Sequence, residues 1–342
     1  MNMSSKLTLM AGVGMFLVTP RTGLADEIPT YPSVKMFGYT QFTGTFASAA
    51  TPHQFGFDRV RFGAKGKIEE GIDYRMLVEM LKTDQPTKAN TTNEALLDAQ
   101  LAYTFAPAAK VTVGQGKTPF GMEFNTSAAK LDVIGFGMSG NVVFDRGLGV
   151  MVSGRKIAGG LGYDLGIYNA GGRGDGTSYS AGTLGNDDLV VGRLLFDLEK
   201  TLHVEGGVGQ ATVTGGGTYS ASYAAVKTAF DPIEIKVEWD RGVQGGRTTT
   251  VMYAQVLGKV AEQVEAVAKW EQTKRSGTGS DLTATNTTLA CNFALDPSHA
   301  DRVRIQAAYV WVGGDAASIG SVVGFKKGVK DDLFKVLVQA GF

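Results

Sequence analysis

The chain has 342 residues, of which 43% are hydrophobic, and it contains 47 glycines but only 9 prolines. Its 33 basic residues balance 33 acidic residues, so no net field draws it to nucleic acid, and we expect no nucleic-acid partner. A single cysteine, Cys291, excludes an internal disulfide framework and any CxxC or CxxCH site for zinc or haem.

The N-terminus has the pattern of a secretory signal peptide. Lys6 precedes the apolar run Leu7–Val18, and Gly23-Leu24-Ala25 provides a cleavage site before Asp26. The alternative is a short membrane anchor, but this run is too short to span roughly 30 Å of hydrocarbon. We therefore predict a cleaved signal peptide over residues 1–25, export, and a mature domain over residues 26–342.

Apolar and polar residues alternate with a period of two along the rest of the chain. Ile233, Ile235 and Val237, for example, alternate with charged residues, as expected of a strand with one apolar face. No later stretch approaches the 18 or more apolar residues of a membrane-spanning helix, so a helical membrane protein is excluded. About sixteen segments alternate in this way, each near the roughly ten residues of a tilted membrane strand. They are 34–48, 56–68, 72–83, 95–106, 111–117, 147–156, 161–169, 187–198, 202–213, 218–231, 233–242, 248–258, 264–273, 281–295, 302–313 and 330–342.

The connections between these segments alternate between short and long. Short turns at one end of a barrel and longer loops at the other are typical of bacterial outer-membrane barrels. The pattern weakens at 214–217 and 243–247, where the long side is short. The long connections are 84–94, 118–146, 170–186, 274–280 and 314–329.

A soluble secreted β-sandwich or adhesin would also alternate, and it is the main alternative fold. Charged residues recur along the polar faces, however, and aromatic residues such as Phe105, Trp239 and Trp311 lie near strand ends, like girdles at a lipid interface. Unpaired sheet edges are costly in lipid, so the sheet must close. We predict an all-β fold, a transmembrane antiparallel β-barrel of about 16 strands surrounded by outer-membrane lipid.

The final predicted strand carries Phe334, Val336, Val338 and Phe342 on one face. A terminal aromatic residue on an alternating strand is similar to the signal by which barrel-assembly machinery recognises its substrates. We expect Phe342 to be this assembly signal and the machinery to be a partner.

The longest connection, residues 118–145, follows the fifth predicted strand. A loop of this length is usually functional or disordered, and its aromatic and apolar content argues against disorder. We expect it to fold inward, pack against the lumen wall and narrow the channel; the alternative is a loop over the barrel mouth or at a subunit contact. The candidate constriction residues are Phe120, Glu123, Lys130 and Asp132.

Several stretches resemble the phosphate-selective porin O/P family. They are FDRVRFGAKGKI, VTVGQGKTPFGMEF, FDRGLGVMVSG and YDLGIYNAGG, and the resemblance covers about residues 55–175, with a looser similarity to the C-terminus. The family implies a homotrimer of sixteen-strand barrels that passes anions or other small solutes. In sixteen-strand porins the third outer loop folds inward, and residues 118–145 form the third outer loop of this chain.

Selective members of the family line the pore with an arginine ladder. The matching positions are Arg59 and Arg61, with Lys65 and Lys67 on the same face and Lys117 at the entrance to the long loop. The period-two alternation adds further basic residues to the lumen face, and barrel closure brings many of them to one wall. The complete basic set is Arg59, Arg61, Lys65, Arg75, Lys117, Arg193, Arg302, Arg304 and Lys335.

Acidic residues concentrate on two later strands, and we expect them to lie toward the opposite side and set a field across the pore. The alternative is that these charges pair across neighbouring strands and keep the lumen wet. The acidic set is Glu234, Glu238, Asp240, Glu265 and Glu271.

No residue pattern indicates catalysis. The histidines, His53, His203 and His299, are far apart and lack metal-ligand spacing, and no serine–histidine pair is evident. We predict no enzyme activity, no cofactor and no metal. The expected function is passive diffusion of small solutes, with a preference for anions such as phosphate, through the outer membrane of a Gram-negative cell. The alternative function is a barrel sheath or scaffold, for example around an outer-membrane cytochrome.

Overall fold

A computed structural model describes residues 30–47, 53–82, 95–169, 188–213, 217–277, 280–315 and 332–342. From Pro32 onward these residues belong to one compact unit, Pro32–Phe342. The predicted signal peptide, residues 1–25, lies outside the described residues.

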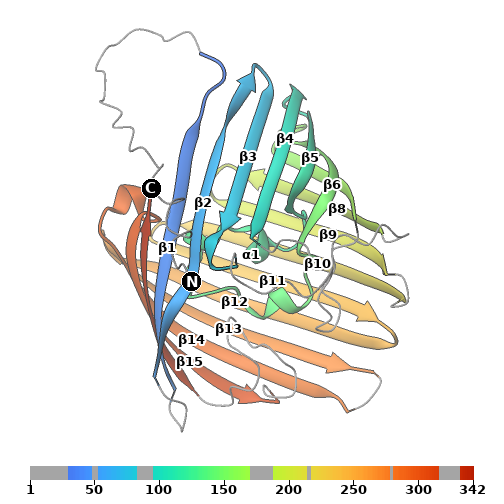
Figure 1. The fold of residues 1–342 in the computed structure, drawn as a ribbon. Helices are drawn as coiled ribbons and strands as arrows, with labels where there is room; N and C mark the ends of the chain where they lie inside the picture. The colour runs from blue at the N-terminus through green and yellow to red at the C-terminus, as the bar shows by residue number, and fades with distance from the viewer. Residues whose placement is uncertain are drawn as a thin grey trace, which may run out of the picture. The chain divides into compact units, whose positions relative to one another are not determined.

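Sixteen strands form a single closed antiparallel barrel (Figure 1). Each strand pairs with its neighbours in sequence, and the first pairs with the last, from Tyr39 opposite Gly341 to Ala47 opposite Leu333. The predicted barrel and its strand number are therefore confirmed. The strands are β1 (Lys35–Ala47), β2 (Gln54–Glu69), β3 (Ile72–Glu79), β4 (Leu96–Ala106), β5 (Ala109–Lys117), β6 (Arg146–Gly154), β7 (Leu161–Asn169), β8 (Asp188–Leu198), β9 (Leu202–Val213), β10 (Gly217–Phe230), β11 (Ile233–Gln244), β12 (Arg247–Ala261), β13 (Val264–Ser276), β14 (Leu282–Ala294), β15 (Val303–Gly314) and β16 (Leu333–Gly341).

The helices are short and lie between strands. They are η1 (Met80–Lys82), α1 (Met122–Asn125), η2 (Ala128–Lys130), η3 (Met138–Asn141) and η4 (Pro297–His299). Within the described ranges, no helix has the length and apolar character needed to cross a membrane.

The two faces of the barrel wall differ in chemistry, as the alternation predicts. Most outward-facing side chains are apolar and exposed, with Val208 at 64% and Ile167 at 63% exposure. Many inward-facing side chains are polar and buried, and Gln339 and Glu238 have no exposed surface. Lipid-facing apolar residues alternating with lumen-facing polar ones are the pattern of a membrane barrel.

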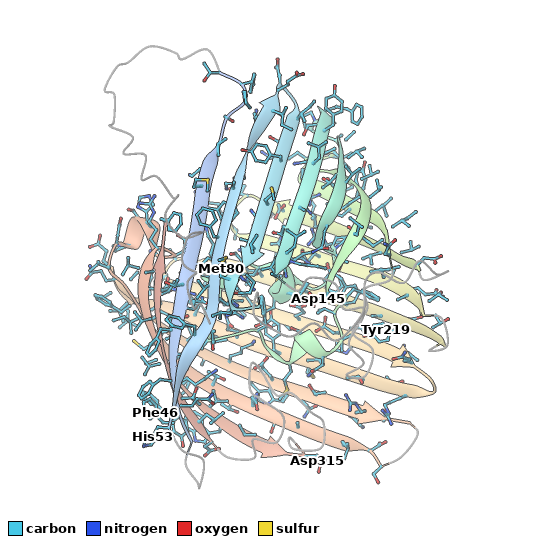
Figure 2. All side chains as sticks on the ribbon, in the orientation of Figure 1. Phe46, His53, Met80, Asp145, Tyr219 and Asp315 are labelled. Atoms are coloured by element: carbon cyan, nitrogen blue, oxygen red, sulfur yellow. The ribbon has the colours of Figure 1, made fainter. Side chains whose placement is uncertain are left out.

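The two ends of the barrel differ in their connections. The strand pairs β2–β3, β4–β5, β8–β9, β10–β11 and β12–β13 are joined by turns of two or three residues, and this end is called the turn end. The opposite end, which includes residues 118–145, is called the loop end. At the loop end, β1 and β2 bring Phe46 and His53 side by side, with ring centres 5.1 Å apart (Figure 2).

One loop-end connection is shorter than the sequence suggests. Gly245 and Gly246 form a two-residue turn between β11 and β12, and both have a positive φ, of 56° and 78°. Such turns continue the strand twist directly. The strands therefore extend to Gln244 and Arg247, beyond the predicted 233–242 and 248–258.

Candidate functional site

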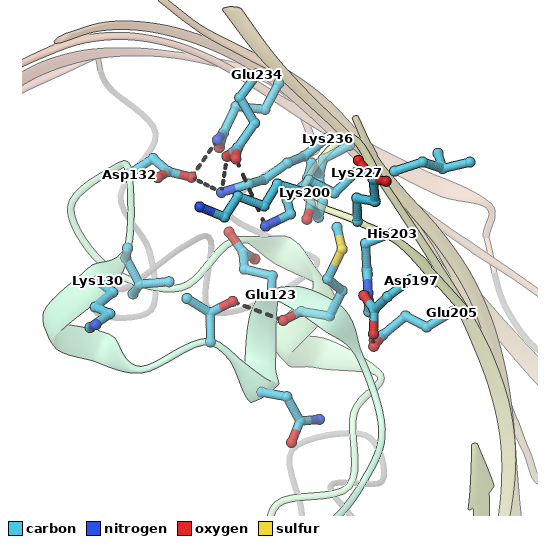
Figure 3. Close-up of a pocket in the computed structure, with 18 residues that line it drawn as sticks. Glu123, Lys130, Asp132, Asp197, Lys200, His203, Glu205, Lys227, Glu234 and Lys236 are labelled. Carbon is cyan, nitrogen blue, oxygen red and sulfur yellow. Dashed lines mark hydrogen bonds and ion pairs between the residues drawn. The ribbon is translucent and has the colours of Figure 1, made fainter. Parts of the chain in front are cut away.

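Residues 118–145, called the lumen segment, lie against the inner face of the barrel. The segment contains α1, η2 and η3, and part of it lies inside the curve of the barrel wall in Figure 3. Its contacts run along β10 to β16 and onto β1. The wall that includes β2, β3 and β4 faces the segment across the lumen.

Carboxylates of the barrel wall bind backbone amides of the lumen segment. The Met122 and Glu123 amides donate to the two carboxylate oxygens of Glu238, at 3.0 and 2.9 Å. The Met138 amide donates to Oε1 of Glu271 at 2.9 Å. Three otherwise unpaired N–H groups at the starts of α1 and η3 are satisfied in this way. Two of the five acidic residues predicted to set a field across the pore, Glu238 and Glu271, thus hold the segment in place.

Lys269 of β13 joins the lumen segment to the wall through a fully buried ion pair. Its Nζ contacts Oε1 of Glu123, and it lies 2.9 Å from Oε1 of Glu271. Glu123 Oε2 also accepts from the Gly137 amide at 2.7 Å and from the Ser139 hydroxyl at 2.8 Å. Removing one member of such a network leaves an uncompensated buried charge.

Side-chain amides and cations hold the middle of the segment. Gln41 of β1 and Gln339 of β16 donate to the carbonyl oxygens of Ala128 and Ala129, both at 3.1 Å. Arg304 of β15 donates to the carbonyl of Leu131 at 2.9 Å. Arg304, predicted to line the pore, therefore binds the segment backbone.

Asp132 binds the wall on the side of β11 and β12. Its Oδ2 lies 2.6 Å from Nζ of Lys236 and accepts from Nε2 of Gln255, also at 2.6 Å. Lys236 also pairs with Glu234, at 2.9 Å. Glu123 and Asp132 are thus both neutralised by cations of the wall that the segment covers.

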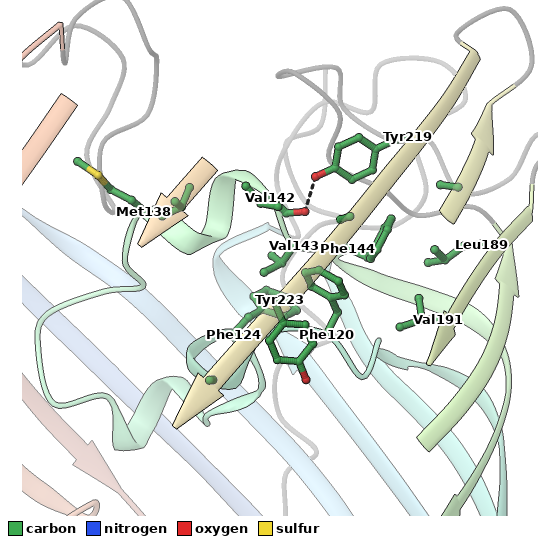
Figure 4. Packing of buried hydrophobic residues seen from close by; sticks show 14 of the residues in the cluster. Phe120, Phe124, Met138, Val142, Val143, Phe144, Leu189, Val191, Tyr219 and Tyr223 are labelled. Atoms are coloured by element: carbon green, nitrogen blue, oxygen red, sulfur yellow. Dashed lines mark hydrogen bonds between the residues drawn. The ribbon is translucent and has the colours of Figure 1, made fainter. Parts of the chain in front are cut away.

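An aromatic cluster fixes both ends of the segment against β9 and β10 (Figure 4). Phe120 packs edge-on against Phe144 with ring centres 5.1 Å apart, and Phe144 packs against Tyr219 at 5.4 Å. A Cβ added at Gly209 would lie 2.3 Å from the Phe144 ring, so the close approach requires glycine at this position. Phe120 and Phe144 have no exposed surface.

The opposite wall carries the basic residues that the sequence singles out. Arg59 donates to Oε1 of Gln41 at 2.8 Å, and its guanidinium lies 5.5 Å from the ring centre of Phe136 in the lumen segment. Arg61 pairs with Glu79 at 2.9 Å and donates to the Tyr39 hydroxyl at 2.8 Å. Among the residues that the structure describes, Arg59 makes no ion pair.

Lys65 and Arg75 lie further toward the turn end of the same wall. Both approach the ring of Phe37, at 5.6 and 4.7 Å, and Arg75 also pairs with Asp98 at 2.9 Å. A second cation, Arg146 of β6, binds the other oxygen of Asp98 at 2.9 Å. Asp98 therefore binds two cations, Arg75 and Arg146, through its two oxygens.

Lys117 lies where the lumen segment leaves β5. Its ammonium donates to the carbonyl oxygens of Phe124 and Thr126, the latter at 2.9 Å, and lies 5.1 Å from the ring centre of Phe136. Lys117 and Arg59 thus approach the same aromatic ring, so two cations lie on the side of the segment that faces β2.

Other predicted basic residues are not part of this group. Arg193 of β8 pairs with Asp164 at 2.6 Å and with Glu205 at 3.3 Å. Arg302 lies in the turn before β15, not in the strand as expected, because β15 begins at Val303. Lys335 of β16 is buried on the inner face. Lys130 of the segment forms a long, exposed ion pair with Asp301, at 3.4 Å.

The sequence does not single out several residues that shape this site, including Phe136, Lys269 and Gln41. Lys269 alternates on the same face as Glu271, so its position toward the lumen follows from the period of two. Its pairing with Glu123 does not, because 146 residues separate the two.

A cavity of about 630 Å³ lies beside the lumen segment, toward the turn end (Figure 3). Carboxylates and ammonium groups both line it, among them Glu234, Lys200 and Lys227. His203 lies between two carboxylates, with Nδ1 2.7 Å from Asp197 and Nε2 3.0 Å from Glu205. Water and small polar solutes suit such a lining. In the part of the chain that is described, no group of three or more His, Cys, Asp and Glu residues has the arrangement of a metal site.

Solved porin structures share this fold. An anion-selective porin from Comamonas acidovorans aligns with a TM-score of 0.65 and 13% identity, over 91% of this chain and 99% of that one. OmpT of Vibrio cholerae, with loop L8 deleted, aligns with a TM-score of 0.63 and 14% identity over the same shares. Another OmpT structure, of the trimer form, has a TM-score of 0.61 and 14% identity over 91% of this chain and 99% of that one. At these identities the likeness shows the fold.

The sequence gives a second comparison. Among curated protein sequences, none matches this chain. Residues 37–186, which include β2, β5, the lumen segment and β6, match the family model of phosphate-selective porin O and P. The resemblance to the phosphate-selective porin O and P family is thereby confirmed over residues 37–186 of a chain that has the sixteen-strand porin fold.

Proposed function

We propose that this chain is an outer-membrane porin that lets small solutes diffuse passively and favours anions such as phosphate. The observation that supports this most directly is the division of the lumen. The segment 118–145 covers the wall that contains Glu238 and Glu271, and it leaves Arg59, Arg61 and Arg75 on the other wall. Arg61 and Arg75 have carboxylate partners, but Arg59, Lys65 and Lys117 form no ion pair among the described residues, so a solute that passes the segment meets their positive charge, which favours anions.

The acidic residues of the lumen segment do not offset the positive charge on the side of the segment that faces β2. Glu123 pairs with Lys269 and Asp132 pairs with Lys236, both on the covered wall. Lys117 remains at the edge that faces Arg59, beside Phe136. Lumen charges tune selectivity without changing the barrel itself.

Planar-bilayer recordings of the purified protein test both parts of the proposal. The channel part predicts stepwise conductance, and the anion part predicts a reversal potential of anion-selective sign in a salt gradient. Deletion of residues 127–135 shortens the lumen segment between α1 and η3 and should raise the single-channel conductance. Unchanged conductance would mean that the segment does not limit the passage.

The alternative function, a sheath around a partner such as a cytochrome, requires an unobstructed lumen. The lumen segment argues against it, because it lies against the inner faces of eight strands, from β10 through β16 to β1. Stoichiometric haem in the purified protein would favour the sheath instead.

The proposal includes the assembly and location of the protein. We infer export through a cleaved signal peptide, insertion in the outer membrane, a homotrimer, and no catalytic step or cofactor. The trimer form of OmpT has the same fold, which supports the oligomeric state. N-terminal sequencing of the mature protein, membrane fractionation and the mass of the detergent-solubilised complex test these points separately.

A further inference from the structure

The outer face of the barrel carries two cations near the loop end. Alternation along β11 and β13 places Arg241 and Lys274 on the same face as the exposed Trp239 and Trp270. Arg241 lies opposite Thr250, and Thr250 lies opposite Lys274, so the two cations are two strands apart. At the usual spacing between strands, their Cα atoms are about 10 Å apart.

Within the described part of the chain, neither cation has a neutralising partner. The side chains of Arg241 and Lys274 form no ion pair or hydrogen bond there, and both are exposed. A charged side chain on the lipid face of a barrel is destabilising, most strongly at the midplane of the membrane and less near the interface. An anionic partner from outside the chain would remove this cost.

An apolar groove begins beside Arg241. It has a volume of about 850 Å³ and runs across the outer faces of β11 to β6, past Val208, Leu165 and Val152. Ser222, directly opposite Arg241, and Gly192 on β8 are small and leave the groove open. A Cβ added at Gly192 would meet only the tip of Leu165, at 3.2 Å.

The groove descends from the loop end toward the turn end. Arg241 lies eight residues from the turn-end residue of its strand, Ile233. Residues that lie opposite one another on neighbouring strands form a row with Arg241. In this row, Val208 is six residues from the turn-end residue of its own strand, Leu165 is four and Val152 is two. An acyl chain that starts beside Arg241 and follows the groove would therefore enter the apolar band of the barrel.

We infer that this surface binds a phosphorylated lipid of the membrane leaflet at the loop end. The phosphate lies between Arg241 and Lys274, where Thr250 supplies a hydroxyl donor, and one acyl chain passes Ser222 and follows the groove toward Val152. A guanidinium binds phosphate oxygens through charge-assisted hydrogen bonds, and an acyl chain matches the apolar lining. The inference rests on the proposed membrane placement of the barrel and does not depend on its solute selectivity.

The test is native mass spectrometry of the folded mature protein in detergent, titrated with phosphatidic acid or with phosphatidylcholine of the same chains. The wild-type protein should bind phosphatidic acid at least about tenfold more tightly, as one or two charge-assisted hydrogen bonds provide. The double variant Arg241→Gln, Lys274→Gln should lose this preference. Gly192→Leu, which fills the groove and leaves both charges in place, should weaken the binding of both lipids. The matched control is Lys156→Gln with Lys259→Gln, which removes the same charge at the turn end.

Three results would overturn the inference: equal affinity for the two lipids, an unchanged preference in the double variant, or displacement of phosphatidic acid by millimolar inorganic phosphate. A change in the mass of the oligomer in the double variant, without loss of lipid adducts, would assign the face to a second copy of the chain. Conductance of the same preparation separates the two proposals. A conducting barrel without lipid preference overturns only the lipid site, and a non-conducting barrel with the preference overturns only the channel.

Discussion

The guanidinium of Arg59 lies 5.5 Å from the ring centre of Phe136, so a cation of the barrel wall directly faces the lumen segment. Arg59 has no carboxylate partner among the described residues, in contrast to Arg61, which pairs with Glu79. Arg59→Gln should therefore lower the anion-to-cation permeability ratio. Loss of one unpaired charge beside the path changes the barrier by about 1 kcal/mol, or about fivefold in the ratio.

The measurement is the reversal potential across a bilayer in a salt gradient. Lys156→Gln, an equal change of charge in the turn between β6 and β7, should leave the potential unchanged. The double variant Arg59→Ala, Arg61→Ala should shift it further, although it also leaves Glu79 without its cation. An unaltered potential in Arg59→Gln would remove this residue from the selectivity region.

Glu123→Ala should release one part of the lumen segment from the wall. The substitution removes the partner of Lys269 and the acceptor of the Gly137 amide and the Ser139 hydroxyl. Breaking a buried pair by removing one member costs about 3–5 kcal/mol, which is enough to let a segment with only short helical turns move.

Single-channel traces should then show larger and noisier open currents. Glu262→Ala, in the exposed turn between β12 and β13, is the control and should behave like the wild type. Quiet currents of wild-type size in Glu123→Ala would show that the remaining contacts fix the segment without this pair.

Gly209→Ala should displace the aromatic end of the lumen segment. The new Cβ would lie 2.3 Å from the ring of Phe144, a fully buried residue of the lumen segment. Overpacking of this kind typically costs about 1–3 kcal/mol. The expected result is a lower temperature of heat-induced unfolding in detergent, followed by the change in gel mobility of the barrel.

Gly258→Ala is the matched control, because a Cβ at Gly258 meets no atom within 4 Å. It should unfold at the wild-type temperature or slightly above it. Equal unfolding temperatures for the two variants would mean that Phe144 moves aside at no measurable cost.

Phe342→Ala separates two roles of the last residue. The backbone of Phe342 exchanges hydrogen bonds with Gly38 at 3.0 and 3.3 Å, and its ring lies 6.2 Å from that of Phe62. The backbone bonds survive the substitution, so refolding into detergent should proceed almost as in the wild type.

If the ring is the assembly signal that the sequence predicts, Phe342→Ala should reduce assembly in cells more strongly than it reduces refolding in detergent. The amount of folded protein in the outer-membrane fraction measures this, and Phe334→Ala on the same face of β16 is the control. Equal losses for the two variants, in cells and in detergent alike, would assign Phe342 a packing role only.

The barrel follows from the sequence because each strand carries its own signal. In β11 the period of two separates Val237 and Trp239 from Glu238 and Asp240, and a change of register by one residue would reverse every side chain. Strand ends were less predictable. Gly245 and Gly246 join β11 to β12 directly, where the alternation predicts a longer connection, because their positive φ angles permit a two-residue turn.

The candidate site was only partly predictable. Arg59 and Arg61 of β2 lie beside Gln41, Tyr39 and Glu79 on the inner face, where the alternation of side chains along a strand places them. The alternation does not identify the partner of each side chain, however. Glu238 and Glu271 share the inner face with many polar residues, and their bonds to Met122 and Met138 depend on how a distant segment crosses the lumen. Arg304 points inward as expected, but it binds the Leu131 carbonyl and so is not free to attract solutes.

The lumen segment is held mainly by β10 to β16 and β1, whereas Arg59, Arg61 and Arg75 belong to β2 and β3. Substitutions along β11 to β16 that shift the segment would widen or narrow the aperture while leaving ion preference nearly intact. Substitutions in β2 and β3 would retune the preferred ion without moving the constriction. The architecture therefore allows size exclusion and charge discrimination to evolve as independent traits.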